Sequence, residues 1–107
     1  MFSLFAKKTM SEEAAKAFWM WFEESEEWIV RCIAQHDSDF VFKMDERLKR
    51  VFPYFRGELE FQLGFDGGAG EFFFFHQGKR ELARDGETLG RLMPAALAAR
   101  WQFILQK

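Results

Sequence analysis

GELEFQLGFDGGAGEFFFFHQG, residues 57–78, decides the fold, because it has the pattern of a single β-hairpin. Leu59, Phe61, Leu63 and Phe65 alternate with polar residues or glycine, and this period of two is typical of a strand with one solvated face. The glycine-rich segment 66–70 predicts the turn, since glycine accepts the positive φ angles that hairpin loops use. The second strand of the hairpin is almost wholly aromatic.

The four consecutive phenylalanines at 72–75 cannot share one face of a sheet, because successive side chains of a strand point to opposite faces. The first strand has one apolar face, and its other face carries Glu58, Glu60 and Gln62. We therefore expect two of the four rings to join a face that is otherwise polar, beside Ile104 of the last strand. These rings are then either covered by another part of the chain or form a contact surface.

The length of the hairpin loop decides which pair faces the core, and the sequence leaves two alternatives open. A loop of five residues pairs Phe65 with Glu71 and places Phe73 and Phe75 in the core. A loop of four residues places the other two rings, Phe72 and Phe74, in the core.

A long amphipathic helix is expected from Thr9 to about Gln35, with Thr9 and Glu12 as a capping box and Ser11 as a rival N-cap. Two apolar residues of this helix fall outside its apolar face. Met20 falls on the charged side and Trp19 lies at its flank. Either a second element covers them, or both are exposed.

The remaining elements follow from caps, breakers and periodicity. We expect a second helix from the caps at 37–39 to about Phe52, ended by Pro53, and a polar loop from Lys79 to Asp85. The last part of the chain predicts a short helix at Glu87–Met93, a helical turn opened by Pro94, and a final strand at Arg100–Lys107.

This order predicts an α+β fold: two N-terminal helices, a β-hairpin, a short helix and a final strand. The helices are expected to pack on one face of a small, mainly antiparallel sheet. Residues 1–8 are interpreted as a flexible leader, with a weak contact to a membrane surface as the alternative. Residues 9–107 are interpreted as one domain, since 107 residues suit a single core.

Composition argues against several classes of function. A net charge of −2 disfavours nucleic acid as a partner, because proteins dedicated to nucleic-acid binding are usually basic. Cys32 is the only cysteine, so neither an intramolecular disulfide nor a multi-cysteine metal site can form. No apolar run reaches the roughly 20 residues of a membrane span, and MFSLFAKK is too short for a secretion signal. We therefore expect a cytoplasmic protein.

No group of residues predicts catalysis, a cofactor or a metal. His36 and His76 lack ligand spacing, and Cys32 lies in the apolar stripe of the first helix, where cysteine behaves as a small hydrophobe. The glycines at 66–70 join strand to strand, unlike a phosphate-binding loop. A basic cluster on the second helix is diluted by Asp45 and Glu46, and it consists of Lys43, Arg47, Lys49, Arg50 and Arg56.

Three segments together carry a resemblance: FWMWFEESEEWI at 18–29, ELEFQLGFDGGAGEFFFFHQG at 58–78, and LMPAALAARWQFIL at 92–105. The chain resembles a family of small uncharacterised bacterial proteins with an FWxWF-type first helix and a late Pro…Trp segment that leads into a strand. The resemblance implies an α+β fold and supplies no catalytic residue. The second strand of this chain differs from the family pattern, because it is rich in phenylalanine where relatives mix aliphatic and small polar residues.

The sequence thus predicts a non-enzymatic protein-binding domain, whose partner is a cognate protein or a second copy. One concrete version is an inhibitor of the immunity-protein type, whose acidic surface suits a basic toxin. The alternatives are a small-molecule-binding domain with a pocket between sheet and helices, and a homodimeric structural module. The predicted contact residues are Trp19, Met20, Glu23, Glu24, Glu27, Phe72, Phe73, Phe74, Phe75 and Ile104.

Overall fold

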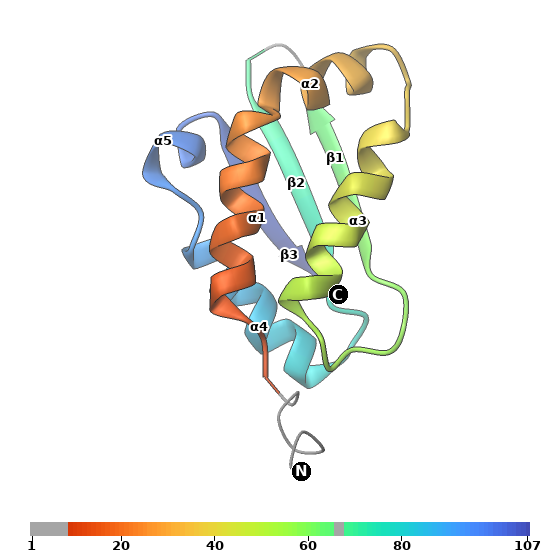
Figure 1. The fold of residues 1–107 in the computed structure, drawn as a ribbon, viewed down its shortest axis with the longest axis vertical. Coiled ribbons are helices and arrows are strands. Elements are labelled where there is room, and N and C mark those ends of the chain that lie inside the picture. Colours follow the sequence, from red (N-terminus) through yellow and green to blue (C-terminus); the bar gives the residue numbers. More distant parts are fainter. Residues whose placement is uncertain (1–8, 66–67) are drawn as a thin grey trace.

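The computed structural model describes residues 9–65 and 68–107, and within them it is an α+β fold, as predicted. Three helices come first, then a hairpin, then two helices and a last strand (Figure 1). The leader expected at 1–8 lies outside the described residues. The elements are α1 (Glu12–Glu24), α2 (Glu26–Ala34), α3 (Asp39–Val51), β1 (Glu60–Phe65), β2 (Gly70–Phe75), α4 (Arg80–Arg91), α5 (Ala95–Ala98) and β3 (Trp101–Gln106).

The sheet has the order β1-β2-β3, so the aromatic strand is central. β1 and β2 pair antiparallel, and Phe65 lies opposite Gly70, so four residues of the sequence separate this pair. Of the two loop alternatives, the shorter one is therefore correct. Phe72 and Phe74 face the helices and are buried, whereas Phe73 and Phe75 point to the other face.

β3 pairs parallel to β2, so the sheet is mixed, with one antiparallel and one parallel pair. The parallel pair follows from the connection, because α4 and α5 carry the chain back to the end of the sheet where β2 began. Both helices contact β3. The side chains of Phe74, Phe103 and Leu105 approach α4, so this helix lies on the same face of the sheet as α1.

A layer of helices covers one face of the sheet, and α1, α2 and α3 lie in front of it in Figure 1. The centre of the interface is the ring of Phe72. Its centroid lies 5.8 Å from that of Trp19, 6.0 Å from that of Phe22 and 5.2 Å from that of Phe103. Burial of such rings is the main stabilising contribution in a core of this size.

The single helix expected at Thr9–Gln35 is two helices that meet at Ser25. Ser11, the rival candidate, is the N-cap, because its Oγ accepts a hydrogen bond from the N–H of Ala14 at 3.0 Å. The ψ angle of Ser25 is 7°, which breaks the regular helix. The break turns α2 across the end of the sheet, where it contacts β1.

The polar loop predicted at Lys79–Asp85 is wrong, because this segment belongs to the helix α4. The polarity of the segment explains the error, because Leu82 and Ala83 are its only apolar residues. Here Gly86 and Gly90 let the helix approach the sheet closely. A Cβ at Gly90 would lie 2.6 Å from Cδ2 of Phe103, and one at Gly86 would lie 2.8 Å from Cδ1 of Leu105.

Gly70 provides a test of how tightly β2 and β3 pack. A Cβ at this position would overlap the ring of buried Trp101, whereas one at Gly64 in β1 would meet nothing within 4 Å. We expect Gly70→Ala to lower the free energy of unfolding by about 1–3 kcal/mol. Gly64→Ala, the matched control, should stay within about 0.5 kcal/mol of the wild type. Urea denaturation measures both free energies, and equal effects of the two substitutions would contradict this close packing of Gly70 on Trp101.

Phe72 and Phe73 provide a second test, because neighbouring residues of identical chemistry face opposite sides of the sheet. Phe72→Ala leaves a cavity among the core rings, so it should cost about 3–5 kcal/mol. Phe73→Ala should cost about 1 kcal/mol, mainly through strand propensity. Urea denaturation of both variants checks the assignment, which would be wrong if the two costs were reversed.

Candidate functional site

The structure removes three of the predicted contact residues from the surface. Trp19, Phe72 and Phe74 are 1%, 1% and 0% exposed. The sequence left open whether Trp19 is covered by a second element or exposed. It is covered, and its indole Nε1 donates a hydrogen bond to the carbonyl of Leu89 at 2.8 Å. None of the three side chains can contribute to a surface of the folded protein.

The other predicted contact residues divide between two sides of the molecule. Met20 is 61% exposed and, with Glu24 and Glu27, lies on the helical layer. Glu23 is half-buried on the same layer, and Coulombic attraction to it helps raise the pKa of the Arg100 guanidinium. Phe73, Phe75 and Ile104 lie on the opposite side, so one flat partner cannot cover both sets.

Phe73, Phe75 and Ile104 form the apolar centre of what we call the outer sheet face. Phe73 lies opposite Ile104 on β3, and Phe75 follows two residues later on the same face. Among the described residues, neither phenylalanine takes part in the ring contacts that connect the core. All three apolar side chains are half-buried, and the polar residues around them are exposed: Glu60, Gln62, Glu71, Gln102 and Gln106.

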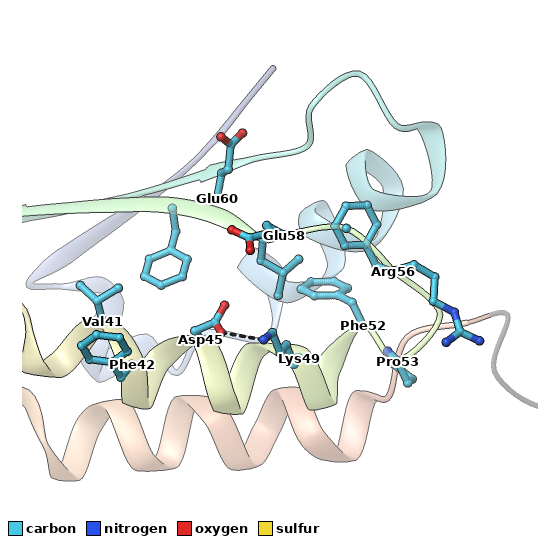
Figure 2. Close-up of a pocket in the computed structure, with 13 residues that line it drawn as sticks. Val41, Phe42, Asp45, Lys49, Phe52, Pro53, Arg56, Glu58 and Glu60 are labelled. Atoms are coloured by element: carbon cyan, nitrogen blue, oxygen red, sulfur yellow. Dashed lines mark ion pairs between the residues drawn. The ribbon is translucent and has the colours of Figure 1, made fainter.

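A second feature, a groove of about 790 Å³ between α3 and the chain that leads into β1, was not predicted from the sequence. Figure 2 shows it with Val41 and Phe42 on the α3 side, and Phe61 also lines it. Phe42 is 73% exposed, more than any other large apolar residue among the described ones. The volume falls in the range of about 300–1,000 Å³ that is typical of ligand sites.

The sequence contains a signal for this groove. Phe40, Val41 and Phe42 are three consecutive apolar residues, and one buried stripe of a helix cannot accommodate all three. Helical spacing from Met44 and Leu48 predicts Val41 in the buried stripe of this helix. In the structure Phe40 occupies that position and is buried, which turns Val41 and Phe42 toward the groove.

Charged side chains border the groove. Lys49 Nζ lies 3.0 Å from Oδ2 of Asp45, and this hydrogen bond is the largest effect that raises the pKa of Lys49. Arg56, Glu58 and Glu60 form no ion pair among the described residues. The unpaired charges at this border are therefore two carboxylates and one guanidinium.

Two hydrogen bonds fix the chain between α3 and β1 that forms the end of the groove. Tyr54 Oη donates to Oδ2 of buried Asp85 on α4 at 2.6 Å. Burial and this bond raise the pKa of Tyr54, so the phenol stays a donor at neutral pH. Gln77 Nε2 donates to the carbonyl of Glu58 at 2.7 Å and anchors the start of β1 beside the end of β2. The groove is thus built on a fixed backbone.

Pairing within the helix layer reduces the basic cluster predicted on the second helix. Lys49 is paired with Asp45, and Arg50 lies 3.6 Å from a carboxylate oxygen of Glu46. The guanidinium of Arg47 lies over the ring of Trp21, 4.9 Å from its centroid. What remains is not a continuous basic surface of the kind that phosphate backbones require.

The residues with catalytic or metal-binding potential are dispersed. Burial raises the pKa of the Cys32 thiol, which disfavours the nucleophilic thiolate. His36 is exposed after α2, whereas His76 follows β2. Within 9–65 and 68–107, no three His, Cys, Asp or Glu side chains gather as a metal site would require. In the same part of the chain, no helix is long and apolar enough to cross a membrane.

Glu26 at the break between α1 and α2 is fixed by β3 and the residue before it. Its carboxylate accepts hydrogen bonds from Arg100 Nε at 2.8 Å, Arg100 Nη2 at 2.7 Å and Trp101 Nε1 at 2.9 Å. The bonds from Arg100 are the largest effect that lowers the pKa of this carboxyl from 4.5; burial acts against them, and Trp101 assists. The ion pair joins the helical layer to the start of the last strand.

Glu26 should make stability depend on pH. In the unfolded chain the carboxyl regains its ordinary pKa and binds a proton more readily than in the folded protein, so acid favours unfolding. The contribution is present above pH 4.5 and is lost as the pH falls through the lower folded pKa. We expect Glu26→Gln to flatten the acid limb of stability measured by urea denaturation. Glu24→Gln is the control, and an unchanged limb in Glu26→Gln would contradict this role.

Comparisons of the chain with models of protein families, with curated proteins and with solved structures find no significant match. The resemblance drawn from the three sequence segments therefore stays a prediction.

Proposed function

We propose that this chain is a protein-binding domain whose contact surface is the outer sheet face. The observation that carries the proposal is the position of Phe73, Phe75 and Ile104 on the side of the sheet opposite the helices. Two phenylalanines and an isoleucine on that side add nothing to the core. An interface with another molecule gives these side chains a role.

The layout of the face supports this function. Specific interfaces combine an apolar centre with a polar rim that stays accessible to water. Here the three apolar side chains form the centre, and exposed glutamates and glutamines of all three strands form the rim. Glu60 and Glu71 are the charged residues of the rim, so the face favours a partner with a basic border.

An inhibitor of a basic enzyme, as immunity proteins are, is one concrete version of this function. A second copy of the chain is the other partner that the face suits. The two versions differ in stoichiometry and charge: self-association would bring the glutamates of two rims together, whereas a basic partner would neutralise them. This difference favours a different protein as the partner.

The alternative of a small-molecule site between sheet and helices has less support. The side chains in that space are buried, and many, including Phe22, Met44, Leu48 and Phe74, are 0% exposed. The groove of about 790 Å³ lies instead beside α3, at the edge of the sheet.

The proposal predicts that Phe73→Ser combined with Phe75→Ser abolishes association while the protein stays folded. Light scattering across a dilution series first measures the mass of the wild type. Self-association that the double variant loses would identify a second copy as the partner. If the wild type is a monomer, we expect it to retain a specific protein from its host on an affinity column, and the double variant to lose it.

Met20→Ser is the matched control, because it removes an exposed apolar side chain from the helical layer. It should leave binding unchanged. Binding that the double variant retains, or that Met20→Ser abolishes equally, would overturn the outer sheet face as the contact surface. Circular dichroism of each variant confirms that loss of binding is not loss of fold.

A further inference from the structure

β1 is an edge strand of the sheet. The hydrogen bonds that β2 makes show which backbone groups of β1 have no partner strand. The N–H of Gly70 donates to the carbonyl of Arg100, just before β3, at 2.9 Å, and the N–H of His76 donates to that of Gln106, the last residue of β3, at 2.8 Å. Even-numbered residues of β2 therefore point their backbone groups at β3, and odd-numbered ones point theirs at β1. Their partners on β1 are residues 60, 62 and 64. The backbone groups of Phe61 and Leu63 consequently point away from the sheet.

This free edge faces the groove along α3. Phe61 lines the groove, and its side chain is on the same face of β1 as the core. Figure 2 shows α3 running beside β1, with Val41 and Phe42 of α3 on the far side of the space. The structure therefore combines unpaired backbone donors and acceptors with adjacent apolar side chains. These are the two components of sites that bind a peptide by strand addition.

We infer that the groove binds an extended segment of another protein, which adds to β1 as a fourth, antiparallel strand. Alternate side chains of the segment then point toward α3, and the intervening ones lie on the outer side, beside Glu60. Apolar residues suit the first set, because they would contact Val41, Phe42 and Phe61. Lysine or arginine suits the second set, because Glu60 is exposed and unpaired and lies on the side of β1 away from α3 (Figure 2).

The geometry favours a single strand over a second copy. Two edge strands that pair about a twofold axis make one continuous sheet with both helical layers on the same face. A second copy would thus bring its own α3 beside this groove, where a single strand brings only its side chains. Both edge strands contact helices, β3 through α4 and α5 and β1 through α2. The groove beside β1, of about 790 Å³, is larger than the one beside β3, of about 450 Å³.

This site is distinct from the outer sheet face. The inference rests on the proposed function only in that the ligand is a protein segment, and the two can fail separately. The probe is the peptide acetyl-Val-Lys-Val-Lys-Val-Lys-Val-amide with a fluorescent label, and fluorescence anisotropy measures its affinity.

Backbone methylation tests strand addition directly. In an antiparallel pair, residues opposite Phe61 and Leu63 have side chains on the α3 side and point their N–H groups at β1. Methylating the valine nitrogens should therefore weaken binding by about tenfold or more, and methylating the lysine nitrogens by less than about threefold. The reverse pattern would still show strand addition, in the parallel direction. Equal effects of both sets would overturn the inference.

Variants of the protein test the walls of the groove. Phe42→Ser should weaken peptide binding about tenfold, and its exposure means that folding is preserved. Glu60→Lys should weaken it about threefold and reduce its salt dependence. Phe73→Ser, on the outer sheet face, and Met20→Ser, on α1, are controls that should keep full affinity. An unchanged affinity in Phe42→Ser would overturn the site, whereas loss only in Phe73→Ser would leave the proposed function standing alone.

Hydrogen exchange measured by NMR distinguishes the occupants. The amide hydrogens of Phe61 and Leu63 should exchange at least about tenfold more slowly when the peptide saturates the protein. A ligand that fills the groove without pairing to β1 would not slow them selectively. If these amide hydrogens exchange more slowly as the protein concentration increases, without any peptide, a second copy occupies the edge. That result would overturn the inference that the edge binds a peptide segment.

Discussion

The structure depends on the contact between Phe72 of the central strand and the aromatic residues of α1. The ring of Phe72 meets Phe18, Trp19 and Phe22 of the helix, and Phe61 and Phe103 of the two neighbouring strands. One side chain therefore joins the helical layer to all three strands. Because rings of this size bury much area each, a few of them close the core of a small domain. The other elements must fit around this cluster.

Close packing around these rings explains where the glycines occur. Gly70 leaves room for the ring of Trp101, and Gly86 and Gly90 let α4 approach Phe74 and Phe103. Residues that weaken a strand or a helix locally thus permit contacts that stabilise the whole. The ion pair of Glu26 with Arg100 acts at the same end of the sheet as Gly70, where it joins α2 to the chain that leads into β3.

Among the described residues, the same arrangement leaves one face of the sheet uncovered and leaves the outer edge of β1 without a paired strand. The connection through α4 and α5 returns on the face that α1 already covers, so the outer sheet face keeps Phe73, Phe75 and Ile104. α3 stands beside β1 and leaves the groove between them. A binding function is consistent with this one-sided layering, because the helices that build the core do not use these two surfaces.

The sequence by itself determined the α+β class, the hairpin, α3 and the position of the last strand, because these depend on local periodicity, caps and breakers. It also determined that two of the four phenylalanines leave the core. Only the tertiary structure decided which two, since that depends on the register between β1 and β2.

Burial of Trp19, the break at Ser25, the helical state of α4 and the groove beside Phe42 were likewise decided by contacts between distant segments. The physical reason is the same in each case. Local preference is worth a fraction of the energy of burying an aromatic ring, so the packing partner decides the outcome.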